Sequence, residues 1–466
     1  HESLLFYDEH TFGASESVSD PLCENSQVQW GEKSAYAWEA VKRTQMLYET
    51  SVGLLQGDLR RGKNPTLTIF NTLNWKRSEM LTVYIDFEVI PRNQFFEITD
   101  FQGHSLKVQP IRYRREGCYY AIFAEDIPPM GYKTFEIVFK QPSTDTGTIT
   151  INNASIENHF YKLQLNPDKG TIQSLYDKEL NCELVDSSSP WELGAFIYEK
   201  LGNRDQLAQY RLDDYNRTGL SECRIIDSSN GPIYQRILLQ GKSPGTDEAF
   251  GVNLEIKLYH DTKRIELEYA IKRLPETDPS GIYVAFPFQL PEGKLAFDVQ
   301  GGTVISGKNQ LEGTSTDWNT VQNFVSVQNN QAQIIIGSSL IPLYQLGDIN
   351  LGKFQYQKQY ERPHVYSWVM NNYWNTNFKA SQEGEFRWSY HLTSSVDPSN
   401  NLATKFGWSS RIPLYARVMP TGTENHKPTE YSAFHFEKDN FLMTSCTPSK
   451  EEGYILPVSY THLTLP

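Results

Sequence analysis

The most chemically distinctive side chains lie near the start of the sequence, in the segment Tyr7-Asp8-Glu9-His10-Thr11-Phe12-Gly13. A histidine ring is a common metal ligand, and neighbouring carboxylates can hold a ligating ring in its orientation. We therefore predict that His10 is a metal ligand and that Asp8 and Glu9 support it. The alternative is a surface histidine with hydrogen-bonded neighbours.

Amides alternate with aromatic rings over residues 368–378. Amides are costly to bury unless they are hydrogen-bonded, so the run predicts either a bonded turn or a polar binding surface. Amides beside stacking rings suit a sugar site. The predicted substrate-binding residues in this run are Asn371, Asn372, Trp374, Asn375 and Asn377.

The overall charge and the missing motifs exclude several functions. The chain has 466 residues, with 43 Lys and Arg against 56 Asp and Glu, which gives a formal net charge of −13. An acidic chain is a poor match for nucleic acid or anionic membranes. No apolar run approaches the roughly 18 residues that a membrane span needs. No phosphate-binding loop, dinucleotide fingerprint or nucleophile elbow is present. We therefore predict neither a nucleic-acid nor a membrane partner.

The hydrophobic pattern predicts helix first and strands afterwards. From about Trp30 to Arg61, apolar residues recur at spacings of three and four, which predicts one long amphipathic helix, or two, packed into a helical bundle. After Pro65 the period changes to two, as in Val252–Leu258 and Ile265–Ile271. From 148 to 457 the patterns are strand-like, without a convincing helix. The predicted fold is therefore mainly β with an N-terminal helical segment.

Seven further segments follow the His10 segment along the chain, and their order indicates a known family. They are Phe70-Asn-Thr-Leu-Asn-Trp75, Ile127-Pro-Pro-Met-Gly-Tyr-Lys133, Ile156-Glu-Asn-His-Phe-Tyr161, Gly170-Thr-Ile-Gln-Ser-Leu-Tyr-Asp-Lys178, Tyr283-Val-Ala-Phe-Pro-Phe288, the run 371–377 and Thr447-Pro-Ser-Lys-Glu-Glu-Gly-Tyr-Ile-Leu456. Together with the His10 segment, this order resembles glycoside hydrolase family 38, the zinc-dependent retaining α-mannosidases. The resemblance spans residues 1–457.

The resemblance implies a division into domains. We expect the end of a catalytic barrel at 1–13, a remnant of a three-helix bundle at 14–64, a small β-sandwich at 65–141 and a large galactose-mutarotase-like β-supersandwich at 148–457. Residues 458–466 match a translated sequencing adaptor and are predicted to be a non-native tail without a structural role. The barrel itself is expected upstream of His1.

The resemblance also implies the chemistry. Retaining hydrolysis of α-mannosidic bonds uses one carboxylate as nucleophile and another as acid/base, and neither is expected in this chain. One Zn²⁺ per catalytic site would bind adjacent sugar hydroxyls, with His10 as one ligand and the barrel supplying the others. Because one histidine does not replace four ligands, the chain alone is predicted to be inactive. A β-domain aromatic also reaches the sugar in this family, and Phe196 or Tyr198 matches that position.

Two other functions remain open from the residues alone. A non-catalytic glycan-binding β protein would explain the aromatic content of 13% and the missing catalytic set. An aldose mutarotase-like enzyme would need an acid/base pair inside the β domain. The expected partners are mannose-containing oligosaccharides and, as a possibility, further copies of the chain. The compartment stays open, either cytoplasmic or periplasmic and secreted.

Overall fold

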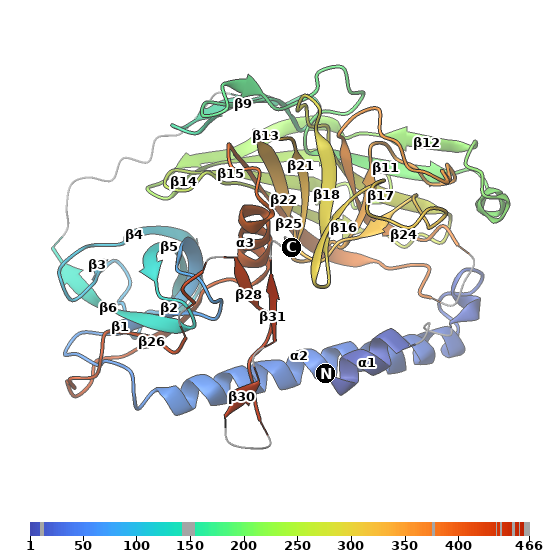
Figure 1. Cartoon of the computed structure of the whole chain (residues 1–466). Coiled ribbons are helices and arrows are strands. Elements are labelled where there is room, and N and C mark those ends of the chain that lie inside the picture. Colours follow the sequence, from blue (N-terminus) through green and yellow to red (C-terminus); the bar gives the residue numbers. More distant parts are fainter. Residues whose placement is uncertain are drawn as a thin grey trace.

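The chain folds into two β domains that are bordered by helices (Figure 1). The computed structural model describes residues 1–9, 14–141, 154–374, 378–434, 436–438, 440–449, 453–455 and 457–460. The predicted fold class, mainly β with an N-terminal helical segment, is confirmed. The helices are α1 (Glu2–Glu9), η1 (Ser15–Ser17), α2 (Glu24–Leu55), η2 (Arg204–Gln209) and α3 (Asn400–Arg411).

The long helix α2 lies about six residues earlier in the chain than its apolar pattern predicts. It begins after Cys23, whose Sγ accepts a hydrogen bond from the backbone N–H of Ser26 at 3.4 Å. It ends at Leu55, where the backbone N–H of the next residue, Gln56, donates to the carbonyl of Gly53. Leu59 therefore leaves the helix and becomes fully buried.

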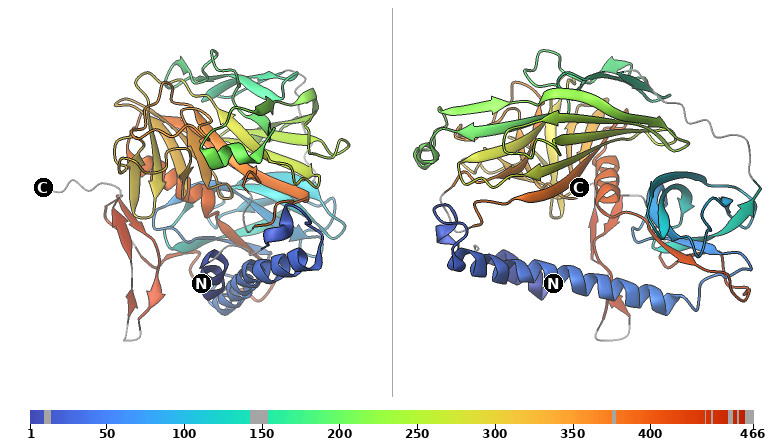
Figure 2. Two further views of the ribbon diagram at one scale, coloured as in Figure 1. Left: turned by 90° about the vertical axis from the view of Figure 1, so that its right-hand side faces the viewer. Right: turned by 180° about the vertical axis from the view of Figure 1, so that it is seen from behind.

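Helix α2 extends from the large β domain to the small one (Figures 1 and 2). Near its start, the Ser17 hydroxyl of η1 donates to the backbone carbonyl of Phe378. Near its end, the ring of Tyr48 lies 5.4 Å from that of Tyr415. Among the described residues, only α1 and η1 pack along it as helices, so much of the predicted apolar stripe is open. Trp38, for example, is 71% exposed.

The small domain is a sandwich of two antiparallel sheets. Its buried core includes Leu67, Leu81, Ile122 and Phe135. One sheet has the order β26-β1-β6-β27, with β3 also paired to β6, and the other has the order β2-β5-β4. The strands are β1 (Thr66–Asn71), β2 (Arg77–Asp86), β3 (Phe95–Thr99), β4 (Lys107–Tyr113), β5 (Gly117–Ile127), β6 (Gly131–Lys140), β26 (Tyr415–Met419) and β27 (Glu430–Ser432).

Two of these strands correct the expected division into domains. Tyr415–Met419 pairs with β1, and Glu430–Ser432 pairs with β6, although both segments were expected in the large domain. The physical reason is edge pairing. The β1–β6 pair presents free strand edges, and a segment distant in sequence covers them. The large domain therefore does not extend to residue 457.

The large domain contains a nine-stranded and a six-stranded antiparallel sheet around one continuous core, with a four-stranded sheet beside them. This pair of large sheets is the predicted β-supersandwich. The four-stranded sheet contains β7 (Ser155–Glu157), β8 (Tyr161–Asn166), β9 (Thr171–Asp177) and β10 (Cys182–Glu183). The six-stranded sheet contains β11 (Ala195–Leu201), β12 (Tyr215–Thr218), β17 (Ser280–Phe286), β20 (Asn319–Thr320), β23 (Leu343–Leu346) and β24 (Val365–Asn371). The nine-stranded sheet contains β13 (Ser221–Asn230), β14 (Tyr234–Lys242), β15 (Val252–Tyr259), β16 (Ile265–Arg273), β18 (Lys294–Val299), β19 (Gly302–Ile305), β21 (Phe324–Gln328), β22 (Gln333–Gly337) and β25 (Gly384–Ser395).

Helix α3 corrects the expectation that no helix follows residue 148. The Ser399 hydroxyl caps it by accepting from the backbone N–H of Leu402. Its buried face carries Ala403 and Gly407, and a Cβ at Gly407 would lie 3.0 Å from the Cβ of Phe324. These small residues let the helix approach the nine-stranded sheet closely. They also make its apolar period weak in the sequence.

The C-terminal segment also differs from the prediction. The short strands there are β28 (Phe441–Met443), β29 (Thr447–Pro448), β30 (Tyr454–Ile455) and β31 (Val458–Tyr460). Strand β31 pairs antiparallel with β28, so part of the expected non-native tail has a place in the fold. Within the described ranges, no helix has the length and apolarity to cross a membrane.

Candidate functional site

A cleft of about 520 Å³ separates the N-terminal segment from the large β domain. One wall is formed by residues between Ala14 and Trp30, and the other by the loops 275–278 and 379–383. We call it the interdomain cleft. Figure 1 shows η1 and the start of α2 next to this side of the large domain. The volume falls within the range of about 300–1,000 Å³ typical of small-molecule sites.

The side chains that line the interdomain cleft are suited to a polyhydroxylated ligand. Glu276, Asp278 and Glu383 place three carboxylates on the β-domain wall. On the other wall, Trp30 is half-buried and the ammonium of Lys379 lies 4.8 Å from its ring centroid. Carboxylates accept hydrogen bonds from hydroxyl groups, and an indole ring offers a flat apolar face. This combination is typical of carbohydrate sites.

Tyr198 connects this wall to the core of the large domain. Its ring is buried, and its hydroxyl donates to Glu276 Oε2 at 3.4 Å. The guanidinium of Arg273 lies 5.6 Å from the centroid of the ring. Burial raises the pKa of Tyr198, so the hydroxyl keeps its proton at neutral pH and stays a donor.

Asn372 holds the loops of this wall together. Its Oδ1 accepts from the backbone N–H of Ser280 at 2.7 Å, and its Nδ2 donates to the carbonyls of Glu276 and Ala380, each at 3.0 Å. The backbone N–H of Glu276 in turn donates to the Ser381 hydroxyl at 3.1 Å. Asn372 therefore positions Glu276 from inside the protein and has its hydrogen-bonding groups occupied by the chain itself.

A buried carboxylate, Glu199, supports β11 from the opposite face. Its side chain is fully enclosed and pairs with Arg217. The hydroxyl of Tyr373 donates to it at 2.5 Å and that of Tyr283 at 3.3 Å. Burial disfavours the charged guanidinium, but the carboxylate overcomes this effect and raises the pKa of Arg217. This network fixes β11, and with it Tyr198, against β12 and β17.

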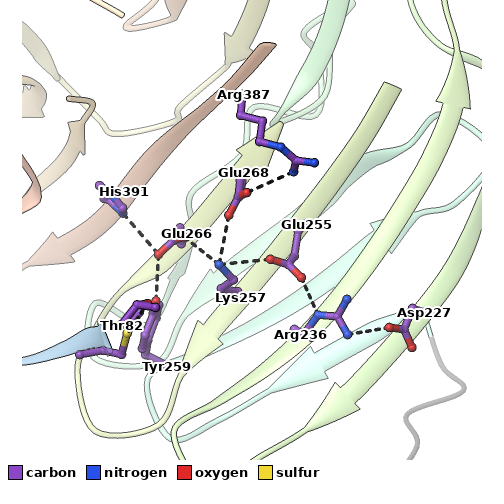
Figure 3. A network of polar contacts seen from close by, with 11 residues as sticks. Thr82, Asp227, Arg236, Glu255, Lys257, Tyr259, Glu266, Glu268, Arg387 and His391 are labelled. Carbon is purple, nitrogen blue, oxygen red and sulfur yellow. Dashed lines mark hydrogen bonds and ion pairs between the residues drawn. The ribbon is translucent and has the colours of Figure 1, made fainter. Parts of the chain in front are cut away.

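A second charged cluster lies on the nine-stranded sheet and is shown in Figure 3. The ammonium of Lys257 contacts Glu255, Glu266 and Glu268 at 3.1, 3.0 and 3.3 Å. Lys257 is directly opposite Glu266 in the strand register, so the cluster follows from cross-strand pairing. Its members come from neighbouring strands and satisfy one another, which is typical of a structural network.

The predicted sugar-site residues do not all come together. Tyr198 and Asn372 both contact Glu276, as described above. Phe196 is 1% exposed within the main core and offers no surface to a ligand in this structure. Asn371 is half-buried at the end of β24, and Trp374 packs among Trp318, Trp368 and Tyr373. Asn375 and Asn377 lie outside the described residues.

The predicted metal site is only partly described. Asp8 and Glu9 are exposed in the last turn of α1, and His10 lies outside the described residues. Within the described ranges, no group of three His, Cys, Asp or Glu side chains could hold a metal ion. Two carboxylates on one exposed helical turn do not make a zinc site, which needs three or four ligands. The described residues alone therefore do not fit zinc.

Sequence reasoning missed the carboxylates and the indole of the cleft. Glu276 and Asp278 stand in Leu274-Pro-Glu-Thr-Asp-Pro279, which has the turn residues of a loop and no known motif. Trp30 lies well over 200 residues from them, at the start of the predicted helix. The useful signal would have been the position of this loop directly after a strongly alternating strand, where side chains gather at one end of a sheet.

Comparisons with known proteins agree with this architecture. Residues 156–354 match the glycosyl hydrolases family 38 C-terminal domain. The chain is similar in fold to an α-mannosidase from Enterococcus faecalis V583, at 13% identity and a TM-score of 0.62, with 91% of this chain and 53% of that one covered. It is also similar to a protein in glycosyl hydrolase family 38 from Enterococcus faecalis, at 13% identity and a TM-score of 0.60, with 93% and 56% covered. No curated protein matches the chain in sequence.

These matches first define a class of fold. The chain shares a multidomain β architecture with part of two glycoside hydrolase structures. The chain spans about half the length of each of those structures. More particularly, the match over 156–354 identifies this chain as one that carries the C-terminal domain of glycosyl hydrolase family 38. The predicted resemblance to that family is confirmed.

Proposed function

We propose that this chain is the substrate-supporting part of a glycoside hydrolase that cleaves α-mannosidic bonds in glycans. The family 38 C-terminal domain supports the glycoside hydrolase class. The α-mannosidase with a similar fold supports mannosides as the substrate class. The interdomain cleft carries the proposal, because it places three carboxylates and an indole opposite each other in a ligand-sized space.

Each cleft residue has a distinct part in this proposal. The Glu276 carboxylate accepts hydrogen bonds from sugar hydroxyls, and the hydroxyl of Tyr198 orients it. The Trp30 ring stacks on the apolar face of a pyranose. Asn372 holds the loop of Glu276, and Glu199 holds the strand of Tyr198, from within the fold. None of these residues is assigned as nucleophile or acid/base, the two carboxyl groups that a retaining glycosidase holds about 5–5.5 Å apart.

Zinc binding stays a prediction for His10 and carries no step of this account. If the whole protein holds zinc, the metal polarises bound oxygens and orients the substrate. A direct test is metal analysis of the purified chain by inductively coupled plasma mass spectrometry. We expect less than one zinc per chain, and whatever zinc is bound should be lost on His10→Ala.

The proposed function is tested by measuring hydrolysis and binding on the same sample. The purified chain should not hydrolyse an aryl α-mannoside, but it should bind methyl α-mannoside in titrations followed by NMR. Glu276→Gln should weaken this binding, and the exposed Glu88→Gln in the small domain should not. Hydrolysis by the chain alone would contradict the proposal that this chain supports the substrate and does not cleave it. Anomerisation of free sugars by the chain would favour the mutarotase alternative instead.

A further inference from the structure

A second cavity, of about 320 Å³, lies at one end of the six-stranded sheet. It is bounded by the loop between β23 and β24, and we call it the loop pocket. Its lining includes Lys358, Tyr360, Arg362, His364 and Tyr366, and it shares no residue with the interdomain cleft. The volume lies near the lower end of the range for ligand sites, so it suits a ligand of monosaccharide size or smaller.

Lys358 is the unusual residue of the loop pocket. It is only 8% exposed, although a lysine is rarely buried unless it is paired. Within the described residues, its ammonium forms no hydrogen bond or ion pair and lies 5.5 Å from the ring centroid of Tyr360. Burial lowers the pKa of Lys358 to about 8, which still leaves the group mostly protonated at pH 7. The ammonium therefore has no acceptor among the described residues.

Three carboxylates around the pocket already have other partners. Asp348 pairs with Lys353 at 3.0 Å. Asp186 accepts from the ring of His364 at 2.9 Å, and the guanidinium of Arg362 lies 3.7 Å from it. Asp317, close to Lys358, accepts from the hydroxyl of Tyr210 and the backbone N–H of Gly352, each at 3.1 Å. Glu361 also lines the pocket, and within the described residues no carboxylate forms a hydrogen bond or ion pair with the Lys358 ammonium.

The loop holds Lys358 in its buried position. Gly307 has φ +74°, and a Cβ there would lie 2.5 Å from the backbone carbonyl of Lys358. The hydroxyl of Tyr360 contacts that of Ser306, and the same ring packs against Gly347, which also has a positive φ. Only glycine fits these two positions easily, so the close contacts on both sides of Lys358 depend on them. These contacts fix the backbone of Lys358 and the ring of Tyr360 before any ligand arrives.

We propose that the loop pocket binds a small organic oxyanion, a carboxylate or a phosphate on a molecule of monosaccharide size, through the ammonium of Lys358 with Arg362 at the rim. An oxyanion would supply the acceptor that the buried lysine lacks, in charge-assisted hydrogen bonds. The half-exposed side chain of Arg362 can add a second, forked set of donors. This site is separate from the cleft and does not depend on the proposed function.

The first test uses the unmodified chain. Amines are acetylated briefly at pH 8, with and without inorganic phosphate, glucuronate or neutral glucose, and each lysine is quantified by mass spectrometry. We expect phosphate or glucuronate to slow acetylation of Lys358 by at least severalfold, and glucose to have no effect. Lys294, which is exposed in β18, is the internal control and should react equally in every sample.

The second test measures affinity by calorimetric titration. Lys358→Met should weaken binding of the effective anion by roughly tenfold or more, because charge-assisted hydrogen bonds are among the strong ones. Lys358→Arg, which keeps the charge, and Lys294→Met should bind as the unmodified chain does within about threefold. Protection by one anion alone identifies phosphate or carboxylate as the recognised group. If neither anion protects Lys358, or if Lys358→Met binds as tightly as the unmodified chain, the proposal is wrong.

Discussion

The hydroxyl of Tyr198 donates to the carboxylate of Glu276 across 3.4 Å, and this bond joins strand β11 to the loop that lines the interdomain cleft. Tyr198 is anchored in the main core, whereas Glu276 faces the cleft. Through this pair, the β domain can impose a fixed geometry on a group that contacts ligand.

Removing the Tyr198 hydroxyl should affect binding more than stability. Tyr198→Phe keeps the buried ring but deletes one hydrogen bond, worth about 1 kcal/mol. We expect affinity for methyl α-mannoside to fall by about threefold to tenfold, measured by NMR titration. Tyr113→Phe, at an exposed tyrosine of β4, is the matched control and should leave the affinity unchanged.

The indole of Trp30 should contribute to mannoside affinity because it lines the interdomain cleft, and not because it belongs to α2. Trp30→Ala removes the flat ring beneath Lys379, and we expect roughly a tenfold loss of mannoside affinity from the missing stacking contact. Trp38→Ala, on the same helix but 71% exposed and away from the cleft, should have no effect. Equal losses in both variants would argue against stacking in the cleft.

The buried Glu199 should be essential for stability. Glu199→Gln leaves the largely buried guanidinium of Arg217 without its counter-charge, and breaking such a pair costs about 3–5 kcal/mol. Urea unfolding should show a loss of this size. Glu222→Gln, in an exposed pair with Lys242, should cost less than about 1 kcal/mol. A loss below about 1 kcal/mol for Glu199→Gln would show that the buried guanidinium of Arg217 does not depend on the charge of Glu199.

Low pH should reduce the free energy of unfolding of the large domain, partly through His391. This histidine lies beside Glu266 in the network of Figure 3. Burial lowers the pKa of His391 from 6.5 to about 3, with Arg264 contributing. Between these values the unfolded chain binds a proton that the folded chain does not, so stability falls as pH drops from 6.5 toward 3. Lys257 lowers the pKa of Glu266 against the effect of its burial, and this carboxylate adds a loss of the same sign at acid pH.

The histidine contribution can be isolated with a variant. His391→Asn should flatten the fall in unfolding free energy between pH 6 and 4.5 by up to about 1.4 kcal/mol per pH unit. His159→Asn, at an exposed histidine, should leave the slope unchanged. An unchanged slope in His391→Asn would mean that the ring is protonated equally in the folded and unfolded chain.

The sequence predicted the order of the elements better than their long-range pairing. Alternation identified strands such as Val252–Tyr259, because one face of the strand is buried and the other is polar. It did not indicate that Tyr415–Met419 returns to the small sandwich, because an exposed edge has no signature in a distant segment. Helix α3 was missed because its buried face carries Ala403 and Gly407 instead of large apolar residues.

The candidate site was predictable only in part, for a similar reason. Asn372 was identified from local composition and Tyr198 from the family resemblance, and both contact Glu276. The facing wall comes from Trp30, and the Glu199 network joins residues up to 174 positions apart. Such constellations arise from tertiary contacts that leave no local spacing to recognise. Asn372 was expected to bind substrate, but burial gives its amide a structural partner for each hydrogen bond.

The most direct test of the central claim is to titrate methyl α-mannoside into the full chain and into Glu276→Gln, with NMR shifts as the readout. The account predicts saturable binding by the unmodified chain, no hydrolysis of an aryl α-mannoside, and affinity reduced by roughly tenfold in Glu276→Gln, because a charged acceptor becomes a neutral one. Binding of equal strength by the variant and the unmodified chain, with both folded, would contradict the assignment of the interdomain cleft as the sugar site.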